Sequence, residues 1–194
     1  MIYKIKRSTY SRYWHQVFSL LNKRLFTHKI YPIMTLNTVN YLNLVGYIIN
    51  VLVTFFASPL LGFPDNGTIS AQFQTIITPT GFTFAIWGII FLSQLIFTIV
   101  QMLPQYRSTA IVQDGVKYLY FYACIAQSAW TFAFGYFFFL LSTVFMFLIL
   151  ASLYGIVMQQ TKIEASIGEF WLFKFPVRVR MWWMVDMSCF FFGF

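Results

Sequence analysis

The chain has 194 residues, of which 59% are hydrophobic, 22% are aromatic and only 9% are charged, with a formal net charge of +8. Soluble domains carry about 25% charged residues, so the composition excludes an ordinary globular domain, a disordered chain and a disulfide scaffold. An integral membrane protein is the class that remains. The sequence shows no carboxylate pair, nucleotide-binding loop or Cys/His cluster. We therefore predict a non-enzymatic protein without a metal site, a covalent cofactor or a nucleic-acid partner.

The amino-terminal segment, residues 1–40, contains basic residues and no acidic ones. Between Tyr10 and Leu25 its aromatic and aliphatic residues recur at helical spacing, which is typical of a basic amphipathic helix on an anionic membrane surface. An acid-poor, basic start also describes a transit segment for an organelle, and both interpretations stay open. We expect an organelle membrane, either plastid thylakoid or mitochondrial.

Apolar runs predict the membrane spans, because a bilayer core of about 30 Å needs about 20 apolar residues as helix. Residues 41–62 and 82–103 each fit one span, and the long run 118–159 fits two, with Gly135 as the turn between them. The last run, Met181 to Phe194, is too short. The sequence thus predicts an all-α integral membrane protein, a helical bundle with four full transmembrane helices plus a partial fifth. Its domains are the surface segment 1–40 and the transmembrane domain 41–194.

The basic residues suggest an orientation for this bundle. Under a four-span threading every Lys and Arg falls on one side, including Arg178 and Arg180 after the fourth helix. Lys and Arg accumulate on the side that is not translocated. We therefore expect the amino terminus on the cytoplasmic, stromal or matrix side.

Three of the predicted spans carry a polar and aromatic stripe at helical spacing, and such stripes mark the inner seams of a membrane bundle. The stripes are Asn43, Tyr47, Asn50 and Thr54; Trp87, Phe91, Gln94, Thr98 and Gln101; and Tyr120, Cys124, Gln127 and Thr131. Two interpretations stay open. The amides could join neighbouring helices by hydrogen bonds, or the stripes could line an aromatic-walled cavity that suits a flat hydrophobic ligand.

The tryptophans divide by their position along the chain. Trp87 and Trp130 lie within predicted spans. The others are expected near the membrane interfaces, where aromatic belts form: Trp14, Trp171, Trp182 and Trp183.

Several stretches resemble one known family. Residues 63–70 read FPDNGTIS and residues 77–91 read ITPTGFTFAIWGIIF; QSAW follows at 127–130, and SIGEFW with a later FP occurs within 166–176. These motifs resemble the tryptophan-rich sensory protein or translocator protein family, called TspO/MBR-like, in its longer branch. The resemblance covers about residues 43–176. After Pro176 the sequence departs from the family pattern, which continues as a full apolar span, and the basic start is not a family element.

The resemblance implies a five-helix membrane bundle whose members are linked to binding porphyrins, related tetrapyrroles and sterols. Carried over by position, it places Pro79, Phe84, Trp87 and Trp130 near the ligand pocket. Together with the polar stripes it defines our candidate ligand-binding residues: Asn50, Pro79, Phe84, Trp87, Phe91, Gln94, Gln127 and Trp130.

We therefore predict a membrane protein that binds a hydrophobic ligand between its helices, either a tetrapyrrole of the porphyrin type or a sterol. A chlorophyll-type pigment or a lipid would be a non-covalent cofactor of the same kind. The alternative is a structural accessory subunit of a large pigment- or haem-bearing photosynthetic or respiratory complex. The basic tail and the incomplete fifth helix favour that alternative, which would add other membrane subunits to lipids as partners.

Overall fold

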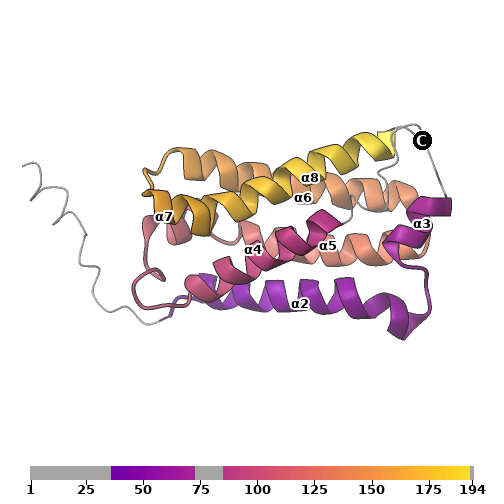
Figure 1. Cartoon of the computed structure of the whole chain (residues 1–194), viewed down its shortest axis with the longest axis horizontal. Helices are drawn as coiled ribbons and strands as arrows, with labels where there is room; N and C mark the ends of the chain where they lie inside the picture. The colour runs from indigo at the N-terminus through magenta and orange to yellow at the C-terminus, as the bar shows by residue number, and fades with distance from the viewer. Residues whose placement is uncertain (1–35, 73–84, 193–194) are drawn as a thin grey trace, which may run out of the picture. The chain divides into compact units, whose positions relative to one another are not determined.

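The computed structural model describes residues 36–72 and 85–192, with side chains as far as Ser188 (Figure 1). All regular structure in these ranges is helical. In chain order the helices are α2 (Thr38–Leu61), α3 (Asn66–Gln72), α4 (Ile86–Val100), η2 (Ile111–Val116), α5 (Leu119–Gly135), α6 (Phe139–Thr161), α7 (Ile167–Glu169), η3 (Phe170–Lys174) and α8 (Phe175–Phe192). The all-α prediction is confirmed for the described part of the chain. The predicted surface segment 1–40 lies outside the described residues except at its end, where α2 already begins.

The helix α2 ends at Leu61, next to Gly62, where the sequence predicts the end of the first span. Gly62 adopts a φ of 75°, a left-handed conformation that glycine enters at little cost, and its N–H donates to the carbonyl of Ser58 at 2.9 Å. The chain then leads into α3, where the Asp65 carboxylate accepts hydrogen bonds from the backbone N–H groups of Gly67 and Thr68 and from the Thr68 hydroxyl. This cap explains the local form of the FPDNGTIS motif.

The division between α5 and α6 falls where the sequence predicts it, but for a different reason. The left-handed residue of the turn is Phe137, with a φ of 63°, whereas Gly135 is the last residue of α5. A Cβ atom at Gly135 would lie 2.4 Å from Cδ2 of Phe63. Gly135 is therefore needed for the close approach of the buried Phe63 ring and not for the turn itself.

The expected partial fifth helix is wrong in its bounds. Helical structure runs without a break from Ile167 to Phe192 through α7, η3 and α8. Ser166 starts it with a capping box, in which its hydroxyl accepts from the N–H of Glu169 and the Glu169 carboxylate accepts from the N–H of Ser166. At 1.5 Å per residue the run is about 39 Å long, which is enough to cross a bilayer core. Counting apolar residues alone missed it, because Arg178 and Arg180 interrupt the apolar pattern.

The five long helices of the described part pack as a closed ring. α5 lies between α2 and α6, α6 contacts α8, α8 contacts α4, and α4 returns to α2. Figure 1 shows these helices running side by side, with the short α3 beside the far end of α5. Each long helix therefore turns one face to the interior of the ring and one face outward.

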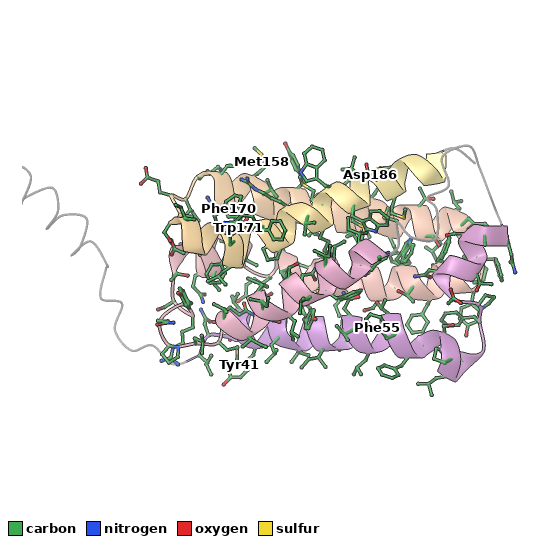
Figure 2. The ribbon with its side chains drawn as sticks, in the orientation of Figure 1. Tyr41, Phe55, Met158, Phe170, Trp171 and Asp186 are labelled. Carbon is green, nitrogen blue, oxygen red and sulfur yellow. The ribbon has the colours of Figure 1, made fainter. Side chains whose placement is uncertain are left out.

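The distribution of polar side chains is inverted relative to a soluble protein. The three predicted stripes point inward, since Asn43, Asn50, Gln94, Thr98, Gln101, Gln127 and Thr131 are all buried. Large apolar side chains cover the outside, such as Leu52, Phe55 and Leu148. In Figure 2, Tyr41 projects from α2 away from the other helices. An apolar exterior of this extent is stable only against lipid or another apolar surface.

The prediction of four full transmembrane helices is only partly supported by the lengths of the helices. Within the described residues, two helices are long and apolar enough to cross a membrane, namely α2 and α6. The helix α4 is apolar but spans only 15 residues from Ile86, and α5 has 17 residues. The expected four full transmembrane helices therefore do not follow from length and apolarity.

Candidate functional site

The seam between α4 and the helix α7–η3–α8 contains Trp87, Phe91 and Gln94, which are three of the six predicted site residues that the structure describes. Three contacts fix its register. Trp87 meets Trp183, Gln94 meets Arg180, and Phe97 meets Phe173. Later residues of α4 thus face earlier residues of the partner helix, so the two helices are antiparallel. The seam has an aromatic part around Trp87 and a polar part around Gln94.

The aromatic part of the seam is built from both helices. The Trp87 ring stacks on Phe91 one turn further along α4, with centroids 5.7 Å apart and planes at 27°, and meets Trp183 edge to face at 6.1 Å. Phe91 also contacts Phe55 of α2 at 5.2 Å. Trp87 itself is only partly buried. Among the described residues, a Cβ atom at the neighbouring Gly88 would meet nothing within 4 Å.

The polar part of the seam is centred on Arg180, whose exposed fraction is 0%. One terminal nitrogen, Nη1, donates to Oε1 of Gln94 at 3.1 Å and lies 3.7 Å from the sulfur of Cys124. The other, Nη2, donates to the carbonyl of Ala123 at 3.3 Å and to Oε1 of Gln127. The guanidinium therefore joins α8 to α4 and α5 through neutral acceptors. Its Nε has no hydrogen-bond partner among the described residues.

Gln94 is the shared acceptor of this cluster. Its Oε1 accepts from Arg180 and also from the Tyr120 hydroxyl at 3.0 Å. Its Nε2 is buried and has no hydrogen-bond partner in the described part of the chain. Tyr47 adds a further link by donating to the carbonyl of Phe91 at 2.9 Å. Buried amides that join three or four helices are what the helix-joining interpretation of the stripes predicts.

A second amide network at the end of α4 supports the same interpretation. Asn40 donates to the carbonyl of Gln101 at 2.9 Å, and Asn43 donates to the carbonyl of Lys117 at 3.2 Å. Gln113 donates to Oδ1 of Asn40 at 3.1 Å. These bonds connect the start of α2 to the segment between α4 and α5, so the outer members of the stripes have a structural role.

The remaining predicted site residues are placed differently. Asn50 is buried in α2, where its Oδ1 accepts from Thr54 at 3.4 Å, and its Nδ2 has no hydrogen-bond partner among the described residues. Trp130 is buried in α5 and stacks on Phe134 of the same helix, with centroids 5.1 Å apart and planes at 11°. Pro79 and Phe84 lie outside the described residues. The structure thus brings together Trp87, Phe91, Gln94 and Gln127.

Two buried residues of this seam escaped the sequence interpretation. Arg180 was expected on one membrane surface with the other basic residues, and that expectation is wrong because its side chain lies inside the ring of helices. Trp183 was expected near an interface, but only 3% of it is exposed. A helical pattern carried through the basic residues would have found Arg180. The buried residues Phe173, Val177, Arg180, Met184 and Met187 recur at spacings of three and four.

These features define a class. The described part of the chain is a ring of helices with an apolar exterior, a buried amide network and two buried cations, Lys174 and Arg180, as expected for a membrane protein that holds its helices together by interior polar contacts.

The comparisons with known proteins give the family. The model of the TSPO-like protein family matches residues 40–188, and the chain belongs to this family. The match extends beyond the resemblance seen in the sequence, which stopped near Pro176, and so includes most of α8. Membership of the family indicates a membrane protein that binds a ligand. Searches of curated proteins and of solved structures found no match.

Proposed function

We propose that this protein binds a tetrapyrrole of the porphyrin type, without catalysing a reaction on it, against the aromatic part of the α4–α8 seam. The observation that carries the proposal is the Trp87–Phe91–Trp183 cluster, in which Trp87 is partly exposed and, within the described part of the chain, a Cβ atom at Gly88 would meet nothing within 4 Å. A flat ring stacked on these side chains gains about 0.5–1.5 kcal/mol per aromatic contact beyond its buried area. Several such contacts and the buried area together support micromolar affinity, which needs about 8 kcal/mol.

The binding test compares two tryptophans of one helix pair. The protein is titrated in detergent with protoporphyrin IX, and quenching of tryptophan fluorescence and the porphyrin absorption band are followed. Trp87→Ala should weaken binding about fivefold or more through lost stacking. Trp182→Ala is the matched control, since Trp182 is 66% exposed on the neighbouring α8. Equal loss in both variants, or no binding by the wild type, would count against the proposal.

The bundle is proposed to cross the membrane five times, with the amino terminus on the cytoplasmic, stromal or matrix side of an organelle membrane. The unbroken helix from Ile167 to Phe192 supports the fifth crossing. Gln72 and Gln105 are exposed at opposite ends of α4 and suit single-cysteine labelling in a chain without its native cysteines. Gln72→Cys should react with an impermeant reagent from one side only, and Gln105→Cys from the other. Labelling of both from the same side would disprove this topology.

The alternative of an accessory subunit lacks a specific observation in its favour. It depended on a basic tail that lies outside the described residues and on an incomplete fifth helix. Helical structure from Ile167 to Phe192 is long enough to cross a bilayer core, which removes the second ground, and we do not pursue this alternative.

A further inference from the structure

Arg180 is a buried cation for which no described residue supplies a carboxylate. The protein has five acidic residues, and all of them lie in the described ranges. Asp65 and Glu169 cap helices, and Asp114, Glu164 and Asp186 are exposed. Figure 2 shows Asp186 on the outer side of α8. The hydrogen bonds of Arg180 go to two amide oxygens, a carbonyl and a thiol, all of which are neutral.

A guanidinium enclosed in a low-dielectric bundle without an anion is costly, because neutral dipoles replace only part of its hydration. Such a residue in a membrane segment is a functional-site hypothesis by default. Two donors in this cluster also have no partner among the described residues, Nε of Arg180 and Nε2 of Gln94. They belong to side chains that already touch each other, and a carboxylate offers two oxygens that accept from both.

The position of this cation relative to the aromatic cluster sets the kind of molecule that fits. Gln94 lies two helical turns from Trp87, about 10 Å along α4, and Arg180 lies three residues from Trp183 on the facing helix. An apolar ring against Trp87 and Trp183 would therefore carry its anionic group toward Arg180.

We propose that Arg180, with Gln94, binds the carboxylate of an amphipathic hydrophobic ligand whose apolar body lies against Trp87 and Trp183. This assignment rests on the ligand-binding function proposed above and specifies the charge of the ligand. The ligand is an acid, and the corresponding neutral ester or alcohol binds more weakly. Arg180 neutralises the carboxylate, and the aromatic cluster holds the apolar body.

The test uses two matched pairs of probes on the full chain in nanodiscs: protoporphyrin IX against its dimethyl ester, and oleate against oleyl alcohol. In the wild type at least one acid should bind about tenfold or more tighter than its neutral partner, as expected for one charge-assisted contact. Arg180→Gln should reduce this ratio to near one, and Arg180→Lys should keep part of it. Arg178→Gln is the control, since it removes the same charge from a partly exposed position over the Phe170 ring.

A second variant guards against simple misfolding of Arg180→Gln. Gln94→Glu gives Arg180 an internal carboxylate, so the helices should stay joined while the preference for acids is lost. If protoporphyrin IX and its dimethyl ester bind equally tightly, and Gln94→Glu changes neither affinity, the tetrapyrrole function stands and the acid site is wrong. If no porphyrin binds but oleate is preferred through Arg180, the tetrapyrrole proposal fails and the acid site stands. If neither acid is preferred over its partner, Arg180 has only a structural role and the inference is overturned.

Discussion

Replacing Gly135 by alanine tests the closest approach of a side chain to any of the described glycines. The new Cβ would lie 2.4 Å from Cδ2 and 2.6 Å from Cε2 of Phe63. The Phe63 ring cannot easily move, because it is buried and packs against Phe132 at 6.3 Å and Tyr136 at 5.3 Å. Overpacking of this kind costs about 1–3 kcal/mol. The helix-propensity gain of alanine over glycine, at most about 1 kcal/mol, offsets only part of it.

The expected net loss of about 1–2 kcal/mol corresponds to a fall in Tm of about 2–8 °C for a chain of this length. Thermal unfolding in detergent, followed by tryptophan fluorescence, measures it. Gly88→Ala is the control, since a Cβ there meets nothing within 4 Å, and its Tm should not fall. Adding Phe63→Leu to Gly135→Ala should recover part of the loss. Equal Tm values for Gly135→Ala and Gly88→Ala would refute the packing argument.

Three further predictions concern hydrogen bonds. The Thr68 hydroxyl, and then the backbone N–H groups of Thr68 and Gly67, hold the pKa of Asp65 below its ordinary value. The cap therefore stabilises the fold fully at pH values above the ordinary pKa. This stabilisation is lost as the pH falls through the lowered pKa of the folded state. The wild type should thus lose stability on acidification below about pH 4, whereas Asp65→Asn should be flat there; parallel pH curves would contradict this. Glu169→Ala should cost about 0.5–1 kcal/mol and Glu169→Gln less, since glutamine also completes a capping box; equal unfolding midpoints would argue against that role. Tyr120→Phe should lower the free energy of unfolding by about 1 kcal/mol through loss of its bond to Gln94, and an unchanged value would show that this bond adds nothing.

Periodicity in the sequence was sufficient for most of the fold. Apolar run length located α2, α5 and α6 within a few residues, and polar spacing identified the inward faces of the helices that carry Asn50, Gln94 and Gln127. Both signals are local, since they depend on one helix at a time. They were sufficient to locate a helix and its inward face wherever the outer face of that helix is purely apolar.

The same signals failed at the last helix and at the centre of the site. Arg180 is tolerated inside the bundle only because Gln94 and Gln127, far away in sequence, supply acceptors, and no local pattern reports such a partner. The role of Gly135 depended in the same way on Phe63, which lies more than 70 positions earlier in the chain. The family motif marked Trp87, but its partner Trp183 lies beyond the part of the chain where the resemblance was visible.

The buried cation of α8 also bears on how the protein enters its membrane. An arginine near the middle of a helix costs about 2.5–3.5 kcal/mol during insertion, and α8 is not apolar enough to pass as a span by itself. Its acceptors lie on α4 and α5, which precede it in the chain. We therefore expect α8 to depend on these two helices for its place in the membrane, so that the order of synthesis favours the order of assembly.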